Sequence, residues 1–190
     1  MSGISVRMRY GMLTAVVALA GCGGGVKFRP VSDVPVRVGK PYAVRGVTYV
    51  PAADPGYDYL GYASWYGHES GNRTANGERF LPRAVTAAHA TLPLPSYVEV
   101  TSLETGRTIL VRVNDRGPFT GRGRIIDLSR GAAEQLGIMA AGHAPVRVRV
   151  VEPPEKDRRK LREGKEAPER PVVDARVLAN LRAQLAEQGR

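Results

Sequence analysis

Apolar and polar residues alternate along several short stretches between residues 57 and 151. Val98 and Val100 alternate with polar neighbours, and the valines of 146–150 alternate with arginines. A repeat of two residues is typical of strands with one buried face. The pattern predicts six strands, at 59–66, 84–88, 97–102, 108–114, 124–128 and 145–151. Short strands at this spacing favour a small β-barrel.

One helical pattern interrupts the predicted strands. Ser129 can cap a helix whose apolar face carries Ala132, Ala133 and Leu136, and Gly137 can end it. A second helix is predicted at 174–188, where Val177, Leu178, Leu181 and Leu185 form one stripe. This stripe either docks on the barrel or binds a partner. The preceding residues, from 152, are charged and rich in proline, which predicts a solvated, mobile segment.

The first residues have the three zones of a signal peptide: Arg7 and Arg9, an apolar run at 12–19, and small residues before Cys22. Leu19-Ala20-Gly21-Cys22 resembles the bacterial lipobox, which implies lipidation of Cys22 after export. An ordinary cleavage site that leaves a free cysteine is the alternative. Gly23 rather than Asp after the cysteine resembles the outer-membrane sorting pattern.

These patterns divide the chain into four parts. We expect a signal peptide at 1–21, a lipidated cysteine with a flexible tether at 22–56, a barrel at 57–151, and a charged tail with a short amphipathic helix at 152–190. The tether is expected to be extended because its recurring prolines exclude a helix.

The formal net charge of the chain is +10, and the excess is spread thinly along the sequence. An exported chain with three Phe, one Trp and no binding motif does not fit a nucleic-acid partner. Anionic lipid or anionic cell-wall polymer suits this charge better. The three histidines have no metal-ligand spacing, so we expect neither a metal nor a cofactor.

Two turns carry carboxylates beside predicted strand ends. Gly117 and Pro118 must end the strand at 108–114, which presents Asp115 to solvent or ligand. An aspartate that only caps its own turn is the alternative. Asn76-Gly77 is a tight-turn signal, and Glu78 follows it directly.

Two aromatic residues precede a glycine at the end of the first predicted strand. The flat faces of Trp65 and Tyr66 suit sugar rings, although Trp65 can also simply pack in the core.

Five ordered motifs, WYG, TANGE, TAAHATLPLPSYVEV, VRVNDRGPF and RIIDLSRGAAEQLGI, resemble the rare lipoprotein A (RlpA) family. The resemblance covers residues 59–151. It implies a mainly β fold, a six-stranded double-psi β-barrel with one or two short helices, and the activity of a peptidoglycan lytic transglycosylase.

The resemblance and the chemistry of the residues together give a set of expected functional residues. The catalytic candidates are Glu78, His89 and Asp115, with Asp115 acting as acid and then base and Glu78 assisting or exchanging roles with it. The expected substrate-binding residues are Trp65, Tyr66, Asn76, Asn114, Arg116 and Asp127. Arg112 and Arg116 can either meet substrate carboxylates or hold down the pKa of Asp115.

The chain departs from the family pattern at two places. It carries 68–73 where family members often have Phe-His-Gly, and residues 152–190 are too short and too charged for the glycan-binding SPOR domain that many members carry.

Two functions follow. The first is an endolytic lytic transglycosylase that cleaves MurNAc–GlcNAc linkages in peptide-poor glycan strands, giving 1,6-anhydro ends. The alternative is an expansin-like lipoprotein that binds glycan without cleaving it. Both imply a protein anchored by lipid in the bacterial envelope, facing the periplasm, with glycan strands and cell-division or cell-wall proteins as partners.

Overall fold

The computed structural model describes residues 29–67, 71–121 and 123–188. Cys22 and the signal-peptide pattern lie outside the described residues. Among those that are described, no helix is long and apolar enough to cross a membrane.

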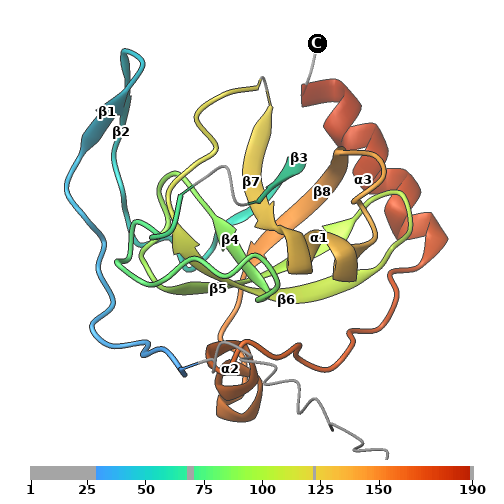
Figure 1. The fold of residues 1–190 in the computed structure, drawn as a ribbon. Helices are drawn as coiled ribbons and strands as arrows, with labels where there is room; N and C mark the ends of the chain where they lie inside the picture. The colour runs from blue at the N-terminus through green and yellow to red at the C-terminus, as the bar shows by residue number, and fades with distance from the viewer. Residues whose placement is uncertain (1–28, 68–70, 122, 189–190) are drawn as a thin grey trace, which may run out of the picture.

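The centre of the molecule is a closed six-stranded barrel (Figure 1). Its strands are β3 (Asp58–Tyr66), β4 (Thr86–Ala88), β5 (Ser96–Ser102), β6 (Thr108–Asp115), β7 (Arg124–Ser129) and β8 (His143–Val150). They neighbour one another in the order β3-β7-β4-β6-β5-β8. The pairs β3–β7 and β4–β6 are parallel, whereas the other pairs are antiparallel. The predicted mainly β barrel fold is confirmed, and each predicted strand matches an observed one within a few residues.

The alternating pattern separates the inside of the barrel from its outside. Val98, Val100 and Val148 are completely buried in the core. Glu99, which lies between Val98 and Val100 in the sequence, is on the outer surface, where its carboxylate pairs with Arg149 at 2.7 Å. Burial of the valines therefore fixes the register, because a slip by one residue would turn the charged side chains inward.

Helix α1 (Arg130–Leu136) has the predicted caps. The Ser129 hydroxyl accepts a hydrogen bond from the Ala132 N–H at 3.2 Å, and Gly137 ends the helix with a φ of 86°. Gly131 lies directly on the loop before β4, since its N–H donates to the Pro82 carbonyl at 2.8 Å. A Cβ on Gly131 would lie 2.3 Å from the carbonyl oxygen of Arg83. The helix can approach this loop only because residue 131 has no side chain.

Residues 29–56 form a strap along the barrel, where we expected a flexible tether. Its strands β1 (Tyr42–Val44) and β2 (Val47–Tyr49) pair as a hairpin. Arg37 forms a two-way backbone bridge with Leu94, and the Ala52 N–H donates to the Thr91 carbonyl at 3.0 Å. The prolines do exclude a helix, but the extended backbone between them finds hydrogen-bond partners on the barrel.

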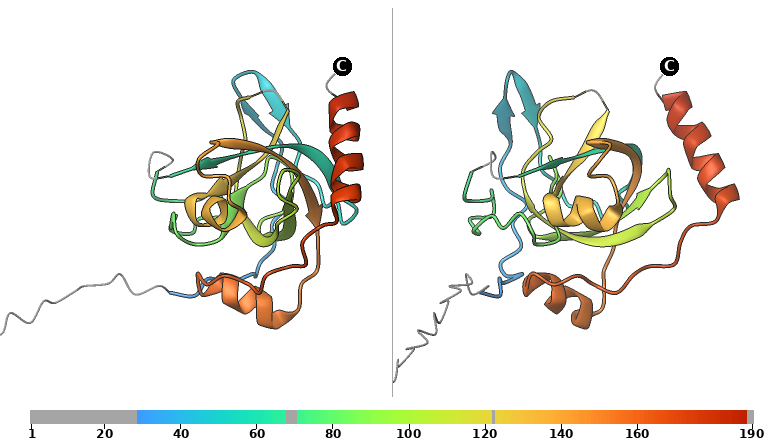
Figure 2. Two further views of the ribbon diagram at one scale, coloured as in Figure 1. Left: turned by 90° about the vertical axis from the view of Figure 1, so that its right-hand side faces the viewer. Right: turned by 45° about the vertical axis from the view of Figure 1, so that its right-hand side comes forward.

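The tail differs from the expected mobile segment. Helix α2 (Glu155–Arg162) lies below the barrel in Figure 1 and buries Leu161 and Asp157. Helix α3 (Ala175–Gln188) matches the predicted amphipathic helix and runs alongside the barrel (Figure 2). In α3 only Leu178 is buried, and the Arg182 guanidinium donates to the Leu103 carbonyl at 2.6 Å. The stripe of α3 therefore docks through a small contact.

We expect Gly131→Ala to lower the free energy of unfolding by about 1–3 kcal/mol, because the added methyl group overlaps backbone that cannot move cheaply. Urea denaturation checks this. Arg130→Ala on the exposed side of the same helix is the control and should change stability by less than about 0.5 kcal/mol. Equal stability of the two variants would contradict the close packing.

Candidate active site

A cleft of about 410 Å³ lies where β6 ends and the loop to β7 begins. The turn before β4, the start of β7 and the tip of the β1–β2 hairpin complete its walls. The polar residues that line it are Arg45, Arg73, Asp115, Arg116, Thr120, Arg124 and Asp127, together with the hydroxyl-bearing Tyr66. Two carboxylates line the cleft: Asp115 lies at the end of β6, and Asp127 lies in the middle of β7.

Asp115 presents one oxygen that accepts no hydrogen bond from the described residues. Its Oδ1 accepts from the Ala75 N–H and the Arg116 N–H, both at 2.8 Å. The β4–β6 register shifts between Ala87 and Ala88, opposite Asp115, and the His89 N–H donates to the Asp115 carbonyl at 3.0 Å. The backbone of Asp115 is thus fixed, while Oδ2 remains available to a ligand.

Burial raises the pKa of Asp115 above its ordinary value of 3.8. The two backbone N–H groups and the Arg116 charge oppose this effect without cancelling it. A carboxyl group with a raised pKa keeps its proton to higher pH, which suits a proton donor.

Asp127 and Tyr66 complete the polar floor of the cleft. Asp127 accepts from the Ser64 hydroxyl at 2.7 Å and pairs with the Arg124 guanidinium at 2.7 Å. The Tyr66 hydroxyl is buried and has no hydrogen-bond partner in the described part of the chain. Burial, followed by the charges of Asp115 and Asp127, raises the pKa of Tyr66 well above its usual range. Tyr66 therefore stays neutral close to both carboxylates.

Glu78 does not face this cleft, although we expected it to assist Asp115 or to exchange roles with it. It lines a separate pocket against the strap. Both of its oxygens accept from the Arg112 guanidinium at 2.8 Å, and the Asn76 and Asn114 amides donate to it at 3.0 and 2.8 Å. The reason is Arg112, which is completely buried in β6 and must be neutralised there.

A short series of hydrogen bonds nevertheless connects the Glu78–Arg112 ion pair to Asp115. Glu78 holds the side chains of Asn76 and Asn114, and the Asn76 N–H donates to the Asn114 carbonyl at 3.2 Å. Ala75, next to Asn76, supplies an N–H to the Asp115 carboxylate. Glu78 thereby fixes the turn that holds Asp115.

His89 lies in a neighbouring pocket of about 420 Å³, which shares Phe119, Thr120 and Arg124 with the Asp115 cleft. Its Nδ1 accepts from the Thr91 and Leu92 N–H groups at 3.1 and 3.0 Å, so its proton is on Nε2. Burial and the charge of Arg116 lower the pKa of His89 to about 4. His89 is therefore a neutral hydrogen-bond donor at neutral pH.

Two expected sugar-binding side chains are occupied elsewhere. Trp65 packs partly buried against the barrel core and is not among the residues lining the cleft. The Arg116 guanidinium donates to the carbonyls of His89, Leu92 and Val38 at 3.2, 2.5 and 2.9 Å. Arg116 therefore fastens the strap to the loop after β4, and it does not form an ion pair with Asp115.

Sequence reasoning missed Asp33, Arg45 and Arg73. An available signal for Asp33 was Arg112 itself, because an arginine within the apolar run ILVRV needs a buried acid. The structure supplies two, since Arg112 Nε also donates to Asp33 at 2.9 Å. The signal for Arg45 was the Arg45-Gly46 pair between two short alternating stretches.

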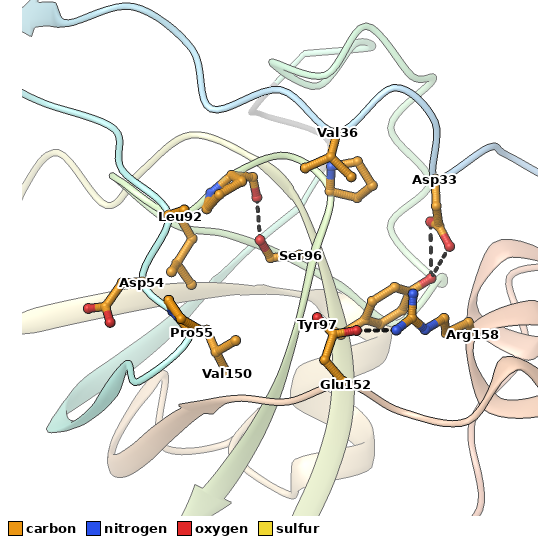
Figure 3. A pocket seen from close by; sticks show the side chains of 13 residues that line it. Asp33, Val36, Asp54, Pro55, Leu92, Ser96, Tyr97, Val150, Glu152 and Arg158 are labelled. Carbon is orange, nitrogen blue, oxygen red and sulfur yellow. Dashed lines mark hydrogen bonds and ion pairs between the residues drawn. The ribbon is translucent and has the colours of Figure 1, made fainter.

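A further pocket of about 290 Å³ lies between the strap, β5 and α2 (Figure 3). Leu92, Val36 and Val150 give it apolar walls, while the Tyr97 hydroxyl donates to Asp33 at 2.9 Å. The Arg158 guanidinium lies over the Tyr97 ring, 5.4 Å from its centre. This pocket shares no lining residue with the Asp115 cleft, and none of the expected catalytic residues lines it. The Asp115 cleft is therefore the candidate active site.

Comparison with known proteins gives the family of the barrel. A family model described as lytic transglycolase matches residues 59–148. The endolytic peptidoglycan transglycosylase RlpA of Pseudomonas aeruginosa (strain UCBPP-PA14) is 52% identical over 115 residues, which are 60% of this chain and 33% of the relative. The barrel belongs to the RlpA family.

A second RlpA relative gives a similar match. The RlpA endolytic peptidoglycan transglycosylase of Campylobacter jejuni is 50% identical over 114 residues, 59% of this chain and 41% of that protein. The chain thus spans less than half the length of these RlpA relatives. Among solved structures, Streptomyces papain inhibitor is 24% identical with a TM-score of 0.44, covering 53% of this chain and all of that one.

The raised pKa of Asp115 predicts how the free energy of unfolding of the RlpA-family barrel depends on pH. A raised pKa in the folded state means that the stabilisation by protonation is complete below about pH 3.8 and is lost as the pH rises through the folded pKa. At pH 7 the buried carboxylate is therefore a cost, and Asp115→Asn should be as stable as the parent or more stable. The difference should disappear in acid, as urea denaturation across pH would measure.

Glu78→Gln is the matched substitution of amide for carboxylate. It leaves the buried Arg112 without part of its counter-charge, so we expect a loss of about 1–3 kcal/mol at pH 7. If Asp115→Asn proves the more destabilising of the two at pH 7, our assignment of Glu78 as the structural carboxylate and of Asp115 as the one with an open oxygen is reversed.

Proposed function

We propose that this protein is an endolytic peptidoglycan lytic transglycosylase, with Asp115 as its acid and base. The observation that carries the proposal is the Asp115 carboxyl group, which lines a cleft with one open oxygen and a raised pKa. The RlpA relatives are named for this activity, and their match covers the barrel that holds Asp115.

The proposed reaction begins with proton donation from Asp115 Oδ2 to the oxygen between MurNAc and GlcNAc. The bond from the MurNAc anomeric carbon to that oxygen breaks, and positive charge develops on the sugar. The 6-hydroxyl of the same MurNAc then attacks the anomeric carbon and forms the 1,6-anhydro ring. Asp115, now a carboxylate, takes the proton of that hydroxyl and is restored. The attack is intramolecular, which raises its effective concentration.

Asp127 and Tyr66 are placed to assist this reaction. The Asp127 carboxylate lines the same cleft and can stabilise developing positive charge, although its pair with Arg124 reduces this effect. The buried Tyr66 hydroxyl is neutral and lies close to Asp115, so it can donate to Asp115 when that group becomes a carboxylate. Both residues thus take a part that the sequence had suggested for Glu78.

Glu78 and His89 act in this proposal by positioning. Glu78 is saturated with four hydrogen bonds and has no oxygen left for a proton-transfer step. His89 holds the Asp115 carbonyl through its backbone N–H, and its Nε2–H can bind a sugar oxygen in the neighbouring pocket.

We also propose that the chain is exported and anchored through lipidated Cys22, facing the periplasm from the outer membrane. The signal-peptide zones and the lipobox-like residues before Cys22 support this location. Glycan strands would then be its substrate, and cell-division or cell-wall proteins its candidate partners.

A glycan-binding protein without catalysis is the second candidate. The engagement of Glu78 with Arg112 favours it, because the cleft then holds one carboxylate with an open oxygen and one already paired with Arg124. This is fewer free acids than most glycosidases use.

The products of glycan digestion separate the two candidates. Mature protein incubated with strands stripped of peptides should release fragments with 1,6-anhydro ends, identified by mass spectrometry. Asp115→Asn should lower the rate at least 100-fold, as loss of an acid and base does.

Glu78→Gln provides the contrasting measurement. A positioning residue should slow the reaction while leaving both limbs of the pH–rate profile, whereas loss of a titrating catalyst would remove one limb. Binding of strands by the parent protein without any new ends would support the second candidate. Ordinary reducing ends would indicate hydrolysis and contradict both.

A further inference from the structure

The β1–β2 hairpin forms one wall of the Asp115 cleft, although it lies outside residues 59–148. Val44 and Arg45, at the tip of the hairpin, line the cleft together with Asp115 and Asp127. Figure 1 shows the hairpin rising beside the loop that joins β6 to β7. A segment that we expected to be a tether therefore contributes directly to the candidate active site.

Aromatic contacts hold the hairpin in this place. The Tyr42 and Tyr49 rings stack with centres 5.3 Å apart, and both meet the Phe119 ring edge-on at 6.1 and 5.5 Å. The Tyr42 hydroxyl also donates to the Ala90 carbonyl at 2.7 Å. Because Phe119 belongs to the loop that follows Asp115, the hairpin and the catalytic loop are packed as one unit.

Arg45 occupies a backbone position that disfavours it. The turn Arg45-Gly46 has φ values of 52° and 80°, the two left-handed positions of a hairpin turn for which Asn-Gly is the preferred pair. Arg45 is the only residue other than glycine with positive φ in the described part of the chain. An arginine held in this conformation suggests that its side chain has a function.

The arginines that line the cleft differ in how many ion pairs and hydrogen bonds their guanidinium groups form. Arg124 is paired with Asp127, and Arg116 is bound to three carbonyls. Arg45 and Arg73 are exposed and have no carboxylate partner among the described residues. The Arg73 guanidinium makes only a long contact of 3.5 Å to the Gly77 carbonyl. Two guanidinium groups at the rim are thus free to bind an anion.

We propose that Arg45 and Arg73 form a binding site for a carboxylate on the glycan. This inference rests on the proposed function. Hydroxyl and N-acetyl groups of the strand are neutral, so the lactyl group of muramic acid is the anion nearest to the linkage that Asp115 would cleave. A guanidinium binds such a carboxylate with charge-assisted hydrogen bonds. Attachment of a peptide converts this carboxylate to an amide, which removes the negative charge that the two guanidinium groups would bind.

The test measures binding, so that it does not depend on cleavage. The mature chain carrying Asp115→Asn is titrated calorimetrically with strands stripped of peptides, and with the same strands after their lactyl carboxylates are converted to neutral amides. Adding Arg45→Asn should weaken binding of the charged strands about 10-fold. Asn suits the left-handed turn, so the melting temperature should stay equal or rise. Arg45→Lys should recover part of the affinity.

The neutral strands and a second arginine provide the controls. The parent should bind neutral strands about 10-fold more weakly than charged ones, and Arg45→Asn should have no further effect on them. Arg176→Gln, which removes an exposed charge from α3, should bind both as the parent does.

Several outcomes would overturn the proposal: unchanged affinity of Arg45→Asn for charged strands, an equal loss on neutral strands, or no binding by the parent. Absence of 1,6-anhydro products from the unsubstituted protein would instead contradict only the proposed catalysis. The two failures are therefore distinguishable.

Discussion

A completely buried guanidinium holds the parts of this structure together. Arg112 lies inside β6, donates to both oxygens of Glu78, and also binds Asp33 and the Ser32 carbonyl. Arg112 belongs to the barrel, and its partners come from the turn before β4 and from the strap. Removing a partner from a buried charge is strongly destabilising, so these segments must fold together around it. Asp33 extends the network to α2 through Arg162 at 2.6 Å.

This network explains how two carboxylates of one family motif set acquire different tasks. Glu78 neutralises Arg112 and is fully hydrogen-bonded, while Asp115, three residues after Arg112, forms no ion pair with it and keeps an open oxygen. Burial without a full ion pair raises the pKa of Asp115. Environments that differ in this way are how proteins divide the roles of neighbouring acids. The turn at 74–78 connects the two, because Glu78 orders it and Ala75 delivers its N–H to Asp115.

The sequence predicted those parts of the fold that depend on local periodicity. The barrel strands and the caps of α1 follow from alternation at Val98 and Val100 and from Ser129 and Gly137. The strap and α2 were missed because their order comes from contacts with the barrel, such as the Arg37–Leu94 bridge and the burial of Leu161. The position of Glu78 was missed for a similar reason. The motifs predicted that Glu78 is a functional residue. Only the fold shows that Arg112 is buried and forms an ion pair with Glu78.

We infer that Asp115, and not Glu78, contacts the bond that breaks. A crystal structure of the Asp115→Asn variant with a bound glycan strand would decide between the two residues. We expect a glycosidic oxygen within hydrogen-bonding distance of the residue 115 side chain, with Glu78 still bound to Arg112 and touching no sugar. A strand lying in the pocket beside the strap, with its linkage at Glu78 and away from residue 115, would show that Asp115 is not the catalytic acid.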